Sequence, residues 1–163
     1  MEANLRDPVT AYVALGANLG NALQTVLQSF DALAWLPDTR VLARSRLYRT
    51  APFEAQGPDF INAVAQIETR LSAPALLDAL QAIEQQAGRE RPYVNAPRTL
   101  DLDLLMYGQA TMNSPRLTLP HPRWRERAFV LYPLADLWPS IVTTEDWARV
   151  SGQSIGVLPE PPP

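Results

Sequence analysis

The sequence predicts an α+β fold in which helices pack on one face of a mainly antiparallel β-sheet. Two observations lead to this class: apolar residues recur with helical spacing in two segments, and β-rich or alternating segments stand before, between and after them. The length of 163 residues suits one domain with a substantial core. We place that domain at residues 9–158, after an N-terminal extension of residues 1–8 and before a disordered Pro-rich tail of residues 159–163.

The first half of the chain supplies three strands and a helix. Residues 9–16 are β-rich and mostly apolar, which indicates a buried strand. Asn21 and Gln24 resemble a capping box, and the apolar spacing that follows predicts a helix over about 21–34. Residues 40–49 and 60–69 alternate well enough for two strands, joined by an irregular loop with two prolines and a glycine.

The second half supplies a second helix and another strand. Ser72 is a candidate N-cap, Pro74 lies in the first turn, and Gly88 stands where the residue after a helix end is expected. TLDLDLLMYG (99–108) reads as a strand; a short strand within 111–120 and a helix over about 122–131 complete the pattern. The order β-α-β-β-α-β is that of a ferredoxin-like core. One sheet face and the loops would then be open for a site.

The composition of the chain excludes several kinds of catalytic and metal-binding chemistry. The chain has no cysteine, one histidine and, by count, no lysine, which excludes disulfides, thiolate metal sites, two-histidine sites and lysine-dependent catalysis. Residues 89–127 hold seven arginines against four acids, whereas the remainder holds seven against thirteen. A cationic region on an acidic protein suits a small polyanion such as a nucleotide phosphate better than nucleic acid or a membrane. A solvated arginine-rich face is the alternative.

Two carboxylates stand out within the strand expected at 99–108. Asp101 and Asp103 alternate with leucines, so both should point to one face, with their Cα atoms about 6.5 Å apart. Two like charges side by side on an apolar strand are unfavourable without a compensating cation. Mg²⁺ suits two carboxylates together with phosphate and water. The alternatives are exposure to solvent and pairing with Arg98.

Arginines flank this acidic pair in the sequence. Arg98 precedes Asp101 by three residues, and Arg89 and Arg91 lie on the preceding Pro-containing loop. The planar guanidinium binds phosphate through two parallel hydrogen bonds, so these side chains could close over a nucleotide and neutralise developing charge. Ordinary surface ion pairs are the competing interpretation.

Four further side chains could bind a ligand. Phe60 and Asn62 share one strand face, so a ring and an amide could stack on and hydrogen-bond a flat heterocycle, although a strand aromatic is commonly core. Phe129, close to Arg127, allows the same two interpretations. His121, the only imidazole, either donates to a phosphate or is structural.

PRTLDLDLLMYG (97–108) resembles the signature of the 6-hydroxymethyl-7,8-dihydropterin pyrophosphokinase family. The family's other blocks are matched in order by VALGANLGN (13–21), SRLYRTAPF (45–53), GPDFINAV (57–64), IEQQAGRER (83–91), RLTLPHPR (116–123) and RAFVLYPL (127–134). Together the blocks span roughly residues 11–140. The sequence departs from the family where Phe60 replaces a common tyrosine and Asn95 stands in place of an aromatic residue.

The resemblance implies a ferredoxin-like enzyme of tetrahydrofolate biosynthesis that transfers the β,γ-diphosphate of ATP to the pterin hydroxymethyl group and releases AMP. It implies that Asp101 and Asp103 are catalytic through two bound Mg²⁺ ions, and that Arg89 and Arg98 are catalytic through the phosphates. The pterin would be contacted by Thr50, Pro52, Phe53, Phe60, Asn62 and Phe129. ATP would be contacted by Gln81, Glu84, Arg91, Leu104, Arg116, Thr118, His121 and Arg127.

We therefore expect a Mg-ATP-dependent transferase whose partners are two small molecules, ATP and 6-hydroxymethyl-7,8-dihydropterin. We expect a monomer in the cytoplasm, without nucleic-acid or membrane partners, since no secretory signal and no apolar run near ~18 residues is visible. Two other classes remain open: a different Mg²⁺-dependent enzyme, such as a nucleotidyltransferase or nuclease, and a non-catalytic RNA- or anion-binding module.

Overall fold

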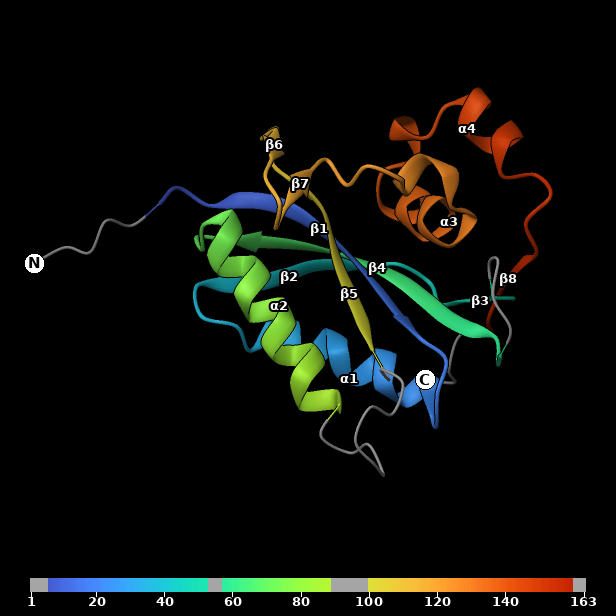
Figure 1. The fold of residues 1–163 in the computed structure, drawn as a ribbon, viewed down its shortest axis with the longest axis horizontal. Helices are drawn as coiled ribbons and strands as arrows, with labels where there is room; N and C mark the ends of the chain where they lie inside the picture. The colour runs from blue at the N-terminus through green and yellow to red at the C-terminus, as the bar shows by residue number, and fades with distance from the viewer. Residues whose placement is uncertain (1–5, 53–56, 89–99, 160–163) are drawn as a thin grey trace, which may run out of the picture.

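The computed structural model describes residues 6–52, 57–88 and 100–159, and its centre is a six-stranded sheet (Figure 1). The strand order is β5-β1-β4-β3-β8, with β2 also paired to β4, and every pairing is antiparallel. These strands are β1 (Val9–Ala17), β2 (Thr39–Arg44), β3 (Tyr48–Thr50), β4 (Phe60–Thr69), β5 (Asp101–Tyr107) and β8 (Ile155–Val157). A separate two-stranded sheet contains β6 (Met112–Asn113) and β7 (Thr118–Leu119).

Helices cover both faces of the sheet. They are α1 (Ala22–Ala34), α2 (Ala73–Gly88), α3 (Ala128–Leu137) and α4 (Thr144–Arg149), with 3-10 turns η1 (Trp124–Glu126) and η2 (Pro139–Ile141). In Figure 1, α1 and α2 lie on one side of the sheet, and α3 and α4 lie on the other. Within the described ranges, no helix combines the length and the apolar character needed to cross a membrane.

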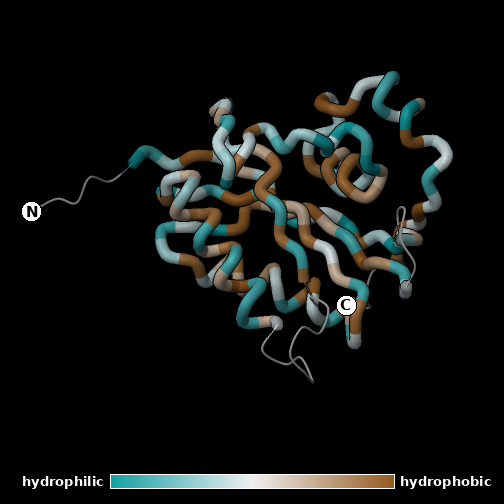
Figure 2. The backbone as a smooth tube through the Cα atoms, in the orientation of Figure 1, coloured by the Kyte–Doolittle hydropathy of each residue, from teal (hydrophilic) through white to brown (hydrophobic). Residues whose placement is uncertain are grey.

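Strand alternation divides the interior into two cores. On β1, Val13 and Leu15 pack toward α1 and α2, whereas Tyr12 and Ala14 face α3. The apolar residues accordingly concentrate along the central strands and α3 (Figure 2). The expectation that the second sheet face is left open is wrong in part, because α3 packs on β4 and covers that part of the face.

The expected strands at 9–16, 60–69 and 99–108 and both early helices are confirmed. Asn21 caps α1 by accepting the Gln24 amide at 3.1 Å, and Ser72 caps α2 by accepting the Ala75 amide at 3.2 Å. Gly108 follows β5 with φ +54°, a conformation that a side chain would disfavour. Gly88 differs from expectation, since it lies within α2 instead of just after it.

Two expected elements are wrong in their boundaries. The strand at 40–49 divides into β2 and β3 because the ladder changes at Ser45: the Ser45 amide still donates to the Val64 carbonyl at 2.9 Å, but the Val64 amide is accepted at 2.8 Å by the Ser45 hydroxyl. The helix at 122–131 begins later, as α3, because Arg127 has an extended backbone (φ −125°, ψ 112°) between η1 and α3. The helix then continues past Pro133. Helix α4 and strand β8 were not predicted from the sequence.

The carboxylate of Asp136 ties the end of α3 to β3. Asp136 accepts hydrogen bonds from the Tyr48 hydroxyl at 2.9 Å and from the Arg46 guanidinium at 2.9 Å. Burial acts to raise the pKa of Asp136, but the hydrogen bonds from Arg46 and Tyr48 outweigh it and hold the pKa below its usual range. Burial, together with Asp136, raises the pKa of Tyr48 to about 12. The carboxylate therefore stabilises the fold in its ionised form.

Asp136→Asn should lower the free energy of unfolding by about 2 kcal/mol at pH 7, the scale of hydrogen bonds to a charged group. A carboxyl whose folded pKa is depressed contributes stability above its usual pKa of about 3.9 and loses that contribution as pH falls through the folded value. Urea denaturation of the wild type and of Asp136→Asn should therefore give free energies of unfolding that differ at pH 7 and converge below about pH 4. A difference in the free energy of unfolding that stays the same from pH 7 to below pH 4 would contradict this role.

Candidate active site

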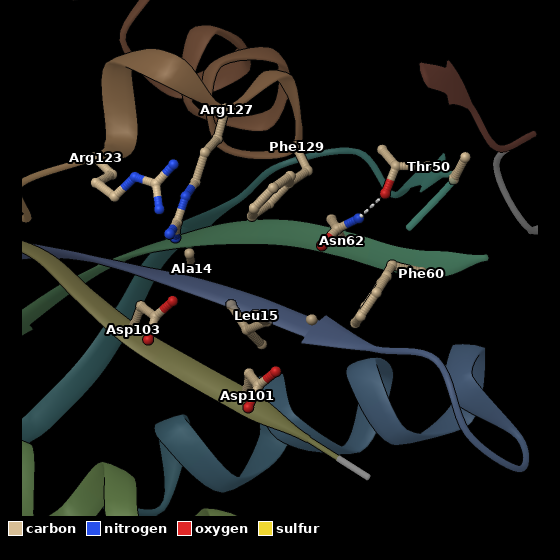
Figure 3. A pocket seen from close by; sticks show the side chains of 12 residues that line it. Ala14, Leu15, Thr50, Phe60, Asn62, Asp101, Asp103, Arg123, Arg127 and Phe129 are labelled. Carbon is tan, nitrogen blue, oxygen red and sulfur yellow. Dashed lines mark hydrogen bonds between the residues drawn. The ribbon is translucent and has the colours of Figure 1, made fainter. Parts of the chain in front are cut away.

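A cavity of about 310 Å³ opens on the α3 side of the sheet, where the strands are not covered (Figure 3). Its floor comes from β1, β4 and β5, and its opposite wall comes from Phe129 of α3 and from Arg123 and Arg127, which directly precede η1 and α3. The lining residues are Ala14, Leu15, Gly16, Thr50, Ala51, Phe60, Asn62, Asp101, Asp103, Arg123, Arg127 and Phe129. Seven of the residues predicted for the site are among them.

Asp101 and Asp103 lie side by side on this floor, as alternation predicts. In the ladder they are opposite Gly16 and Ala14 of β1, and both line the cavity. Leu102 is 4% exposed and faces the other core. Figure 3 shows the two carboxylates at one end of the cavity. Oxygen donors of this kind are those that Mg²⁺ prefers, so the pair fits a magnesium ion. The described residues contain no group of three or more metal-ligating side chains, which leaves further ligands to come from a substrate or water.

Cationic side chains face the carboxylates from the opposite wall. Arg123 and Arg127 extend toward the region above Asp103 in Figure 3. The Arg127 guanidinium also lies over the ring of Phe129, 5.5 Å from its centroid. An anionic group between these two walls would therefore contact arginine directly on one side. On the other side, a bound cation would bridge it to the aspartates.

His121 lies at the outer edge of β5, where its amide donates to the Leu105 carbonyl at 2.9 Å. Its Nδ1 accepts the Arg123 amide at 3.3 Å, so the neutral ring carries its proton on Nε2. Burial lowers the pKa of His121; Asp103 opposes this and nearby arginines reinforce it. The ring is thus a neutral hydrogen-bond donor at pH 7.

The other end of the cavity combines aromatic rings with one buried amide. Asn62 is 4% exposed and donates from Nδ2 to the Thr50 hydroxyl at 2.8 Å. Phe60 and Phe129 come from β4 and α3, and Asn62 lies between them in Figure 3. Gly16 leaves room here, since a Cβ atom at this position would lie 3.0 Å from Asn62 Oδ1. A flat, polar-edged ring fits such a combination.

The remaining predicted residues lie away from this cavity. Arg116 pairs with Asp78 and donates to Gln81 Oε1 at 3.1 Å, so two residues predicted to contact ATP meet between α2 and the β6–β7 sheet. Glu84 accepts the Leu102 amide at 2.8 Å. Leu104 is 3% exposed and packs in the core beneath α1 and α2, so its side chain does not line the cavity. Thr118 is on β7, which contacts β5.

Some predicted residues are placed elsewhere or are outside the described ranges. Pro52 lines a second cavity of about 220 Å³, which shares Thr50, Ala51 and Phe129 with the first. Phe53, Arg89, Arg91 and Arg98 lie outside the described residues, as do residues 1–5 and 160–163. Their predicted roles stay predictions.

Sequence reasoning missed Arg123 and Gly16. Arg123 belongs to the cationic stretch 89–127 and to a motif noted above, so its charge was a usable signal. Gly16 lies in the block VALGANLGN (13–21), but its role depends on Asn62 from the neighbouring strand, which the block alone does not reveal.

Taken together, the sheet, the paired carboxylates, the facing arginines and the aromatic–amide end define an α+β enzyme site for a small ligand with anionic and planar parts. Residues 12–139 match the family model described as 7,8-dihydro-6-hydroxymethylpterin-pyrophosphokinase. The chain belongs to this family.

Curated relatives agree with this assignment. A 2-amino-4-hydroxy-6-hydroxymethyldihydropteridine pyrophosphokinase of Pseudomonas aeruginosa is 49% identical over 131 residues, covering 80% of this chain and 81% of the relative. The Haemophilus influenzae protein of the same name is 42% identical over 135 residues, covering 82% and 84%. The folic acid synthesis protein fol1 of Pneumocystis carinii is 40% identical over 141 residues, which are 85% of this chain but 19% of that protein.

Solved structures show the same fold at low identity. The Plasmodium falciparum HPPK-DHPS structure with pterin and p-hydroxybenzoate superposes with a TM-score of 0.67 at 14% identity, over 84% of this chain and 41% of that one. A second Plasmodium falciparum HPPK-DHPS structure, with SDX-DHP, gives a TM-score of 0.67 at 13% identity, over 84% and 43%. This chain therefore spans about two fifths of those longer proteins.

Proposed function

We propose that this cavity holds Mg-ATP and 6-hydroxymethyl-7,8-dihydropterin together for transfer of the β,γ-diphosphate of ATP to the pterin hydroxymethyl group, with release of AMP. By family, the chain is a pyrophosphokinase of folate biosynthesis. The single observation that carries the finer proposal is the two-ended cavity, with Asp101 and Asp103 at one end and Phe60, Asn62 and Phe129 at the other.

The aromatic end would bind the pterin. Phe60 and Phe129 would stack on the two faces of the ring system, and Asn62 would hydrogen-bond its edge while Thr50 fixes the amide orientation. Pro52 and Phe53 would complete this part of the site. The support is chemical: a buried amide held by one partner still has hydrogen-bonding capacity to offer a ligand.

The carboxylate end would bind the phosphates. Asp101 and Asp103 would hold two Mg²⁺ ions, and these ions would supply neutralisation of phosphate charge and polarisation of the reacting oxygen atoms. Arg127, with Arg89, Arg91 and Arg98, would contact the phosphates from the other side. Transfer of this kind requires positioning and charge neutralisation more than covalent chemistry by the protein, which suits a chain without lysine or cysteine.

The nucleoside part of ATP would run along the outer edge of β5. His121 lies at this edge, and the Arg116–Gln81 pair, Glu84 and Thr118 lie on elements that pack against β5. Leu104 could contribute there only through its backbone, because its side chain is buried. This placement accounts for predicted ATP residues that do not line the cavity.

In the proposed reaction the hydroxymethyl oxygen attacks the β-phosphorus. A new O–Pβ bond forms, the bond between Pβ and the oxygen bridging to Pα breaks, and AMP leaves with that oxygen; the hydroxyl proton passes to solvent. No side chain is assigned as general base. Among the described residues, Arg123 and Arg127 are the cationic side chains that line the cavity.

We further propose that one domain over residues 9–158 carries this activity as a cytoplasmic monomer. Its order β5-β1-β4-β2, with α1 and α2 on one face, supports a ferredoxin-like core to which α3, α4 and β8 are added. The net charge of −3 argues against a nucleic-acid partner.

The test is incubation of the full chain with ATP, Mg²⁺ and 6-hydroxymethyl-7,8-dihydropterin, followed by nucleotide and pterin analysis. AMP and pterin diphosphate in equal amounts are expected. ADP, free pyrophosphate from a nucleotidyl transfer, or no turnover would each refute the proposal. Salt-sensitive RNA binding without turnover would favour the binding-module alternative.

Arg123→Ala should reduce kcat/KM for ATP about tenfold, because an exposed charge-assisted contact to phosphate is worth about 1.4 kcal/mol. Steady-state kinetics with saturating pterin measure this. Arg40→Ala is the matched control, since Arg40 is exposed and pairs with Glu68 away from the cavity. Equal kinetics for both variants would remove Arg123 from the site.

A further inference from the structure

The segment from 150 to 158 forms an arm that contacts two walls of the active-site cavity. It follows α4 and lies beyond residues 12–139, which the family model matches. Its strand β8 pairs with β3, with Ile155 opposite Thr50, and the Leu158 amide donates to the Leu47 carbonyl at 2.8 Å. Through this pairing the arm holds the strand that carries Thr50.

The same arm reaches the other wall through one side chain. Gln153 Oε1 accepts the Ala128 amide at 2.9 Å, and Gln153 Nε2 donates to the Glu126 carbonyl at 2.9 Å. These two backbone groups stand on either side of Arg127. A single half-buried side chain, 25 residues away along the chain, therefore brackets the residue that points into the cavity.

Local structure shows why α3 needs this contact. The first amides of a helix have no partner within the helix and are usually capped by the preceding side chain. Here the preceding residue is Arg127, whose side chain makes no capping hydrogen bond. Gln153 supplies the missing acceptor at Ala128, which leaves the Arg127 side chain available to the cavity.

Phe129 is affected by the same contact. It lies one residue after Ala128 and lines both the main cavity and the second cavity, which Gly152, Gln153 and Ser154 also line. That second cavity, about 220 Å³, gives Phe129 open space in addition to the main cavity. Because packing alone does not fill this space, the ring orientation depends on how the first turn of α3 is held.

We propose that Gln153 is a positioning residue: by capping α3 from the arm, it fixes Arg127 and Phe129 in their orientations toward the phosphate and pterin parts of the site. The substrate part of this statement rests on the proposed function. The side chain touches no substrate itself and acts through the backbone of residues 126–128.

The test compares Gln153→Ala, Gln153→Glu and Ser72→Ala in the full chain. Ser72→Ala removes a comparable cap from α2, on the opposite face of the sheet, so it controls for loss of stability alone. Gln153→Ala should raise the Kd for 6-hydroxymethyl-7,8-dihydropterin about tenfold, whereas Ser72→Ala should change it less than about twofold at a similar loss of Tm. Gln153→Glu retains the acceptor for Ala128 and should give an intermediate Kd.

Amide hydrogen exchange supplies a second readout that does not depend on activity. Exchange at Ala128 and Phe129 should accelerate in Gln153→Ala, while β1 and β4 remain protected. Unchanged pterin binding with accelerated exchange would reduce Gln153 to a structural cap and overturn the proposal. Pterin binding that is weakened equally in Ser72→Ala and in Gln153→Ala would also overturn it. A wild-type chain that fails to bind the pterin would instead refute the proposed function, and the exchange rates would still decide whether Gln153 holds Arg127 and Phe129.

Discussion

Asp103→Asn should lower kcat by about a thousandfold while leaving the unfolding temperature almost unchanged. Asp103 is half-exposed on the cavity floor beside Asp101, so amide replaces carboxylate without repacking a core. A metal ion that neutralises phosphate charge contributes several kcal/mol to the transition state, and about 4 kcal/mol corresponds to this factor. Asparagine retains the shape but provides a weaker, neutral ligand for Mg²⁺.

The measurement is AMP formation at several Mg²⁺ concentrations, together with thermal unfolding of the same samples. Asp101→Asn should behave similarly, and raising Mg²⁺ should restore part of the rate in either single variant. Asp31→Asn is the matched control, because Asp31 is exposed on α1 and pairs with Arg44 away from the cavity. A double variant at both cavity positions with near-wild-type turnover would show that these carboxylates do not hold the metal.

The elements that sequence could predict are those whose signal is local. The strands at 9–16, 60–69 and 99–108 are predicted by their apolar, β-rich residues. The helices α1 and α2 combine apolar residues at helical spacing with a capping residue at the start. The break at Ser45 depends on Val64 of another strand. The first amide of α3, at Ala128, is capped by Gln153, and β8 pairs with β3. Contacts between residues that lie far apart in the sequence produce no local periodicity from which they could be predicted.

The site divides in the same way. That Asp101 and Asp103 share a face follows from strand alternation, and the structure bears it out. That Asn62 lies near Thr50 and above Gly16 depends on how three strands pair, which one sequence does not reveal. Strand alternation already placed Asn62 beside Phe60 as a candidate site residue, the family resemblance added Thr50, and Arg123 came from the structure.

Asn62→Ala should raise the Kd for the pterin about a hundredfold and leave binding of a non-hydrolysable ATP analogue within about twofold of wild type. Thr50 is the only side-chain hydrogen-bond partner of Asn62 within the described part of the chain, and its hydroxyl takes one amide hydrogen. The other polar groups of the amide are therefore placed to bind the ring edge. Loss of two such bonds, at about 1 to 1.5 kcal/mol each, gives the expected factor.

Thr50→Val provides the matched comparison for this prediction. It removes the hydroxyl that orients Asn62 while keeping the buried shape, so the amide remains but can rotate. We expect about a fivefold weaker pterin Kd, because orientation is lost and the ligand bonds themselves are kept. Isothermal titration of both variants with the pterin and, separately, with the ATP analogue measures the four affinities. Asn62→Ala binding the pterin as tightly as wild type would place the pterin outside this cavity, since no other buried amide among the described residues faces it.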